Sequence, residues 1–228
     1  DGGGTTDDAD GAHGDDGDGD AHGADGDGDA HGADGSPEAD GAADGGHAGH
    51  DHGSGNEHVW YDLPVVAAVA ERTAERLGEV APEQRDTFRR NAAAFTDRID
   101  ELSARVDGIA EEHGGKRVAA TAPVAHYLLA DAGVEDVTPR EFVTAVENET
   151  DVPVAAQQRM LDLVSGSEVA ALVRNPQTAG AATGKIVEAA RESGVPVVDA
   201  TETLPQGQND YLAWMGGQIE ALSGALGR

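Results

Sequence analysis

The sequence predicts an α/β fold built on a parallel sheet, and three observations lead to that prediction. After residue 116, short β-prone runs alternate with helical segments, which is typical of parallel strands linked by crossover helices. Before that point, apolar residues recur every three or four positions between residues 82 and 112, which indicates one long amphipathic helix. The first 57 residues consist mostly of Gly, Asp, Ala and His, so they offer almost no side chains for a core.

Residues 1–57 form a low-complexity segment without any Lys or Arg. A nine-residue unit at positions 17–25 is repeated at 26–34, and six histidines are spread along the segment: His13, His22, His31, His47, His50 and His52. This composition predicts a disordered loop. Its function is open between two interpretations: an auxiliary metal-collecting tract of imidazoles and carboxylates, or an acidic, solvated tail.

The stretch from Asn56 to Pro64 marks the start of the folded part of the chain. Asp62 is expected to cap a helix that has Pro64 in its first turn and ends at Gly78. His58 stands just before this helix. From the residues alone, it is either a metal ligand or a turn histidine bonded to its own backbone.

Pro82 is expected to open the long helix, and Gly114 and Gly115 to end it. About thirty residues would span roughly 45 Å at 1.5 Å per residue. The apolar repeat could be a coiled-coil seam, but the flanking charges show no consistent pairing of opposite signs. We therefore expect a single helix packed along a globular body.

The remaining elements follow in alternation. Strands are expected at 117–121, 169–173 and 195–198, and helices at 123–132, from 138–139 onward, and at 153–164, 179–192 and 211–226. Ligands of such sheets bind at the carboxyl ends of the strands, which here are 121–123, 174–178 and 199–203. Glu202 is the best-placed acidic residue at that edge.

Composition excludes several classes of partner and site. A formal net charge of -29 and a pI of about 4.3 argue against nucleic-acid binding, because phosphates would be repelled. Without Cys the chain has neither disulfides nor thiolate ligands. No apolar run reaches the ~18 residues of a membrane span. The sequence starts at Asp1 rather than Met, so we expect any signal or lipid anchor to precede it.

The motifs of the folded part resemble those of the substrate-binding proteins of zinc and manganese ABC transporters. The run His58-Val59-Trp60-Tyr61-Asp62, following an acidic His-rich tract, is similar to that family's NPHxWxDP motif and its His-rich loop. Further similarities lie at 195–198, at 201–203, in the terminal helix with Trp214, and in Asn175-Pro176-Gln177-Thr178, a form seen in one branch of the family. The resemblance covers residues 56–228.

This resemblance implies two α/β lobes joined by a long connecting helix, with a metal held between them. The expected division is a His-rich loop at 1–57, a remnant of the first lobe at 58–81, the connecting helix at 82–115 and the C-terminal lobe at 116–228. Most of the first lobe would precede Asp1. The implied role is capture of Zn(II) or Mn(II) at the extracellular face of the membrane, by a secreted or lipid-anchored protein that delivers the ion to a permease and is not an enzyme.

The resemblance also implies the metal ligands. His58 and Glu202 stand at two ligand positions of the family, whereas a third position falls on Ala122, which has no donor atom. His126, one helical turn further on, is the tentative substitute. A separate acidic cluster, Glu147, Glu149 and Asp151, is expected to face solvent rather than to bind metal.

Two other functions are weighed against metal capture. The first is an acidic α/β interaction module without a metal site, which the alanine at position 122 favours. The second is an α/β hydrolase using Asp199, Glu202 and His126. The Gly-x-Ser-x-Gly turn of such hydrolases does not occur in the sequence, so this alternative is disfavoured.

Overall fold

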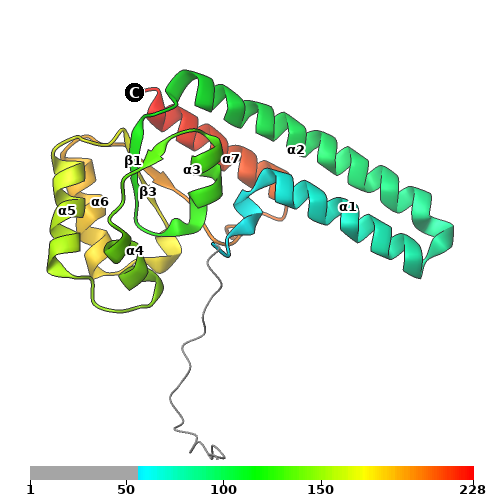
Figure 1. The fold of residues 1–228 in the computed structure, drawn as a ribbon, viewed down its shortest axis with the longest axis horizontal. Coiled ribbons are helices and arrows are strands. Elements are labelled where there is room, and N and C mark those ends of the chain that lie inside the picture. The colour runs from blue at the N-terminus through cyan, green and yellow to red at the C-terminus, as the bar shows by residue number, and fades with distance from the viewer. Residues whose placement is uncertain (1–55) are drawn as a thin grey trace, which may run out of the picture. The chain divides into compact units, whose positions relative to one another are not determined.

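The computed structural model describes residues 56–228, which form a four-stranded parallel sheet with helices on both faces (Figure 1). The strands are β1 (Arg117–Ala120), β2 (Glu135–Asp136), β3 (Ala171–Arg174) and β4 (Val197–Asp199). Their order across the sheet is β2-β1-β3-β4, and every neighbouring pair is parallel. The predicted disordered tract, with its six histidines at 13, 22, 31, 47, 50 and 52, lies outside the described residues apart from its last two positions.

Successive residues of the central strands face opposite sides of the sheet and contribute to two separate cores. Val118 and Ala120 of β1 belong to one core, whereas Ala119 belongs to the other. The first core is covered by α2 (Arg85–His113), α3 (His126–Asp131) and α7 (Tyr211–Leu226), and the second by α4 (Arg140–Glu147), α5 (Val154–Ser165) and α6 (Ala181–Glu192). Burial on both faces explains why these strands read as short continuous apolar runs.

The helix after the His58 segment is α1 (Leu63–Val80). As predicted, Asp62 caps it: the carboxylate oxygen accepts a hydrogen bond from the Val65 backbone N–H at 3.0 Å. The predicted end at Gly78 is wrong, because the helix continues to Val80. A Cβ at position 78 would lie 2.9 Å from Cγ of Arg85, so this glycine instead permits close approach of the chain that starts α2.

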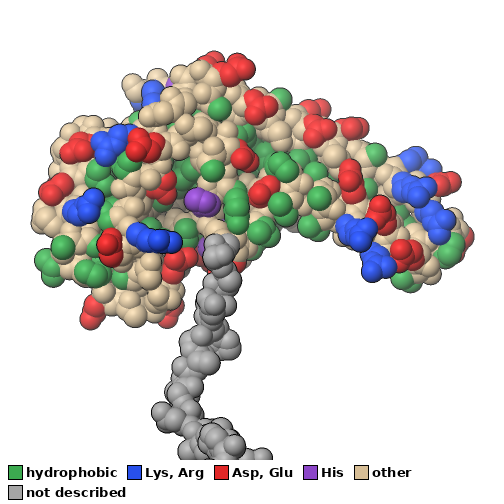
Figure 2. Space-filling model, viewed as in Figure 1, with side chains coloured by type: hydrophobic (Ala, Val, Ile, Leu, Met, Phe, Trp, Pro, Cys, Tyr) green, Lys and Arg blue, Asp and Glu red, His purple; other side chains and the backbone are tan. Residues whose placement is uncertain are grey.

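The predicted long helix is confirmed as α2, which has 29 residues and follows α1 after a short 3₁₀ turn. The two helices lie side by side along most of the length of α1 (Figure 1). Large apolar side chains remain exposed on α1, with 58% of Val69 and 83% of Val80 accessible, and hydrophobic atoms are visible along this pair in Figure 2. Packing on α2 therefore covers one side of α1 and leaves another open.

Two predicted details around β2 are corrected. The sequence predicts three strands, but Glu135 and Asp136 pair with β1 as a short fourth strand at the edge of the sheet. The helix predicted from 138–139 onward begins at Arg140, because Pro139 is its N-cap, and no side chain caps it. The Thr138 hydroxyl instead accepts a hydrogen bond from the Ala120 backbone N–H at 2.7 Å and donates one to the Asp136 carboxylate, so it completes the end of β1.

Among the described helices, none combines the length and the apolar character needed to cross a membrane.

The cap of α1 leads to a prediction about stability. Replacing Asp62 with Ala removes the acceptor for the Val65 N–H, and such losses lower the free energy of unfolding by about 1 kcal/mol. Urea unfolding of the Asp62→Ala variant measures the change. The control is Asp100→Ala, which removes an exposed carboxylate from the middle of α2 and should alter stability by less than about 0.5 kcal/mol. Equal losses in both variants would contradict the capping role.

Candidate metal centre

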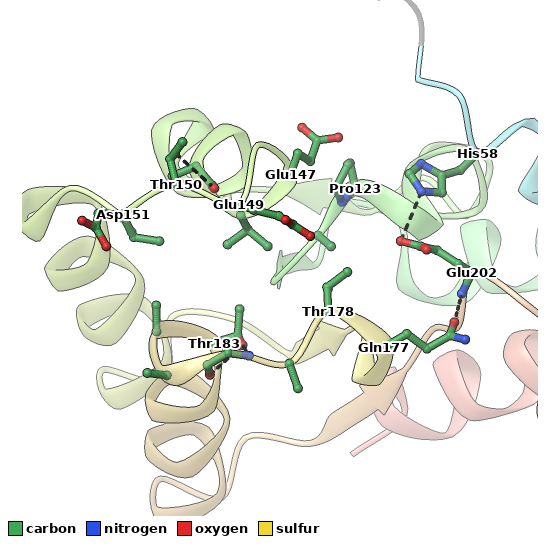
Figure 3. Close-up of a pocket in the computed structure, with 18 of the residues that line it drawn as sticks. His58, Pro123, Glu147, Glu149, Thr150, Asp151, Gln177, Thr178, Thr183 and Glu202 are labelled. Atoms are coloured by element: carbon green, nitrogen blue, oxygen red, sulfur yellow. Dashed lines mark hydrogen bonds and ion pairs between the residues drawn. The ribbon is translucent and has the colours of Figure 1, made fainter.

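A cavity of about 550 Å³ opens at the carboxyl ends of β1, β3 and β4, the edge where the sequence predicted a site. Figure 3 shows His58 and Glu202 at one end of it and the turn between α4 and α5 at the other. The first residues of α6 and the turn after β3 complete the wall. The polar or charged residues of the lining are Glu57, His58, Glu147, Glu149, Thr150, Asp151, Gln177, Thr178, Thr183 and Glu202.

His58 is buried, with 6% of its surface accessible, although it precedes the first helix of the described chain. The residue begins a short 3₁₀ helix, Val59–Tyr61, that leads directly into α1. Its imidazole stacks edge-on against Trp60, with 5.2 Å between ring centroids, and Nδ1 lies 2.6 Å from Oδ1 of Asn56. The ring is therefore fixed on two sides, and its Nε2 side faces Glu202 (Figure 3).

Glu202 follows β4, and its carboxylate oxygen Oε1 lies 3.7 Å from Nε2 of His58. Two donors that each stand about 2.0–2.2 Å from one tetrahedral ion are roughly 3.3–3.6 Å apart. The observed separation is close to that range. The structure thus brings the two main predicted ligands together, although 144 positions separate them in the sequence.

The turn after β3 holds Glu202 in place. The Asn175 side-chain amide donates to Oε1 of Glu202 at 3.0 Å, and Oε1 of Gln177 accepts from the Glu202 backbone N–H at 2.7 Å. Asn175 is itself buried and accepts a hydrogen bond from the Gln177 N–H. In the sequence, Asn175 and Gln177 stand out only as part of a motif, and their contacts with Glu202 arise from the fold.

A partly buried hydrogen bond connects the 3₁₀ helix before α1 to the turn after β4. The Tyr61 hydroxyl donates to the Thr201 carbonyl oxygen at 2.9 Å, and the Trp214 indole N–H donates to the Thr201 hydroxyl at 3.0 Å. Burial raises the pKa of Tyr61 above its usual range, so the hydroxyl keeps its proton and remains a donor. Thr201 precedes Glu202, so these bonds also locate the carboxylate.

The structure does not bring the tentative ligand His126 into the cavity. Its side chain is exposed at the start of α3, where the ring packs against Tyr127 with 5.5 Å between centroids. Ala122 does line the cavity and is buried, as expected of a residue at a ligand position. Its methyl group has no donor atom, so this wall provides space without a ligand.

The acidic residues near the α4 C-terminus face solvent, as predicted, and also line the cavity. Glu147, Glu149 and Asp151 are exposed, and all three form part of its wall (Figure 3). Partial burial raises the pKa of the Glu147 carboxyl; nearby His58 lowers it and Glu57 raises it. None of the described lining residues is Lys or Arg, so the cavity favours cations over anions.

The described residues supply an incomplete set of metal ligands. Within residues 56–228, no three His, Asp or Glu side chains gather closely enough to hold an ion. His58 and Glu202 offer one imidazole nitrogen and one carboxylate, which suit Zn(II) or Mn(II). The donors present fit two positions of such a site and leave the others to water or to groups outside this part of the chain.

Comparison with protein families gives one match. The family model described as zinc-uptake complex component A, periplasmic, matches residues 11–225. A search of curated proteins gave no match.

Solved structures provide a second comparison. The chain is similar to the laminin-binding protein Lmb of Streptococcus agalactiae, which is described as an adhesin with metal transporting activity. The two share 19% sequence identity and superpose with a TM-score of 0.60. The match covers 74% of this chain and 63% of Lmb. It is also similar to FpvC of Pseudomonas aeruginosa in complex with Mn²⁺, at 18% identity and a TM-score of 0.57, with coverage of 75% and 62%. A Zn(II)-bound variant of AdcAII of Streptococcus pneumoniae matches at 20% identity and 0.57, with coverage of 74% and 62%.

These likenesses establish the fold. The predicted α/β substrate-binding-protein fold is confirmed by them and by the observed parallel sheet. The chain spans less than two thirds of the length of the solved structures it matches.

The Tyr61 hydrogen bond leads to a second stability prediction. Tyr61→Phe removes the partly buried hydrogen bond to the Thr201 carbonyl, and a typical intramolecular hydrogen bond contributes about 0.5–1.5 kcal/mol to the free energy of unfolding. Urea unfolding should show a loss in that range. The comparison variant is Tyr211→Phe, whose half-buried hydroxyl bonds the Trp60 carbonyl, and we expect a smaller loss there. An unchanged stability of Tyr61→Phe would refute the role given to this bond.

Proposed function

Since the chain belongs to the family of zinc-uptake complex component A, we propose that it captures Zn(II) or Mn(II) outside the cytoplasm for an ABC importer. The observation that carries this proposal is the pairing of His58 and Glu202 across 3.7 Å at the edge of the cavity. The ion is cargo rather than a cofactor. No reaction is catalysed, and the partner is the permease that receives the ion.

Capture follows from charge and donor chemistry. The acidic lining raises the local concentration of cations, and a neutral imidazole with a carboxylate then replaces part of an ion's water shell. Mixed nitrogen and oxygen donors favour Zn(II) or Mn(II) over Cu(I), which prefers sulfur ligands. His58 and Glu202 are the metal ligands in this proposal, and Ala122 is the position without a donor.

The other segments of the chain also have roles in this proposal. Helix α2, in the segment 82–115, is a rigid connector between the first-lobe remnant at 58–81 and the C-terminal lobe at 116–228. The histidines of residues 1–57 collect ions for the cavity. The protein works at the extracellular face of the membrane, where it meets the permease.

A second candidate is an acidic interaction module that binds no metal. The observation that favours it is Ala122, because the cavity wall offers no donor where a third ligand is expected. The two functions differ in one measurable property, which is a tight metal site that depends on His58.

Calorimetric titration with Zn(II) separates them. The background is the full chain with the six histidines of residues 1–55 replaced by Gln, which removes the imidazoles of the tract. There, His58→Ala should weaken the tight site by more than the ~10–100-fold typical of residues that only support a ligand. Glu202→Gln should weaken it as well.

The matched control is His126→Ala, which removes an exposed imidazole that does not line the cavity and should leave the affinity unchanged. Tight binding that survives His58→Ala rules out the proposed centre. A background protein that binds no Zn(II) or Mn(II) supports the interaction module.

A further inference from the structure

Asn56 makes hydrogen bonds on every side of its position beside the cavity. Its amide nitrogen Nδ2 donates to the Pro123 carbonyl oxygen at 2.7 Å, and its Oδ1 accepts from the His58 backbone N–H at 2.9 Å. The same Oδ1 lies 2.6 Å from Nδ1 of the His58 ring. Its backbone carbonyl accepts from the Tyr127 hydroxyl at 2.7 Å. Asn56 is thus held by hydrogen bonds to the turn after β1 and to α3, and from this position it contacts His58.

These partners determine which way the Asn56 amide points. The Pro123 carbonyl can only accept, so the atom beside it must be the NH₂ group. The His58 backbone N–H can only donate, so the atom beside it must be the oxygen. Exchanging the two atoms would break both bonds, so the orientation follows from the chemistry of the two partners.

The orientation of the amide determines where the His58 proton sits. The oxygen of Asn56 has no hydrogen, so Nδ1 must carry the proton in their 2.6 Å contact. In the neutral ring this leaves the lone pair on Nε2, the atom that lies 3.7 Å from Glu202.

We propose that Asn56 is a positioning residue that fixes His58 in the tautomer protonated at Nδ1 and thereby keeps Nε2 ready to bind the metal. The affinity part of this inference rests on the proposed function, whereas the tautomer part does not. The simpler alternative is that Asn56 only stabilises the turn through the His58 backbone N–H. That alternative predicts no effect on the ring.

Nitrogen NMR of the metal-free full chain reads the tautomer directly. With ¹⁵N-labelled histidine at about pH 8.5, well above the ordinary imidazole pKa, two-bond ¹H–¹⁵N correlations distinguish the protonated from the unprotonated ring nitrogen. His58→Gln assigns the signal. A Zn(II) titration followed on this same signal reports binding at His58 and not at the other histidines.

Three variants make the test specific. Asn56→Ala removes the acceptor, so the ring should shift toward protonation at Nε2 and Zn(II) binding at His58 should weaken by about 10–100-fold. Asn56→Asp keeps an acceptor beside Nδ1 and should retain the wild-type tautomer, which makes it the rescue if Asn56→Ala folds poorly. Asn91→Ala, in an exposed position of α2, is the matched control and should change neither reading.

The outcomes distinguish this inference from the proposed function. A wild-type ring protonated at Nε2, or an unchanged tautomer in Asn56→Ala, overturns the inference. A tautomer that shifts as expected in a protein whose His58 signal never responds to Zn(II) or Mn(II) supports the role of Asn56 in placing the proton and refutes metal capture.

Discussion

The contact on which this structure most depends is the docking of the short segment before α1 against the carboxyl edge of the sheet. Tyr61 is fully buried there and bonds the carbonyl of Thr201, 140 residues further along the chain. Trp214 packs edge-on against the same ring and bonds the Thr201 hydroxyl. This contact completes the core that is covered by α2, α3 and α7. It therefore also sets the distance between His58 and Glu202.

Each of these two donors is oriented by an amide side chain. Asn56 contacts the imidazole, and Asn175 donates to the carboxylate. Both amides sit where a strand ends: Asn56 is bonded to the Pro123 carbonyl after β1, and Asn175 follows β3 directly. Donors held in this way lose little conformational freedom when an ion binds, and such preorganisation favours affinity more than added contact area does.

Several regular elements could be predicted from sequence. The long helix predicted from the apolar repeat between residues 82 and 112 is α2, whose buried side chains lie on one face. The helix predicted at 211–226 has those bounds in the structure, where Asp210 caps its first turn. Predictions failed where tertiary contacts overrode local signals. Gly78 looks like a helix end but lies under Arg85, and the edge strand at Glu135 exists because its backbone pairs with β1, not because its residues prefer strands.

The candidate site was predictable only in part. Parallel topology places the ends of all strands at one edge, which put Ala122 and Glu202 together, whereas His58 comes from outside the sheet and was linked to them by family resemblance alone. His126 is exposed at the start of α3. The sequence places it close to the cavity along the chain but does not determine which side of α3 faces the cavity. In the proposed function, His58 and Glu202 supply two of the donors around the ion, and the remaining positions go to water or to groups outside residues 56–228.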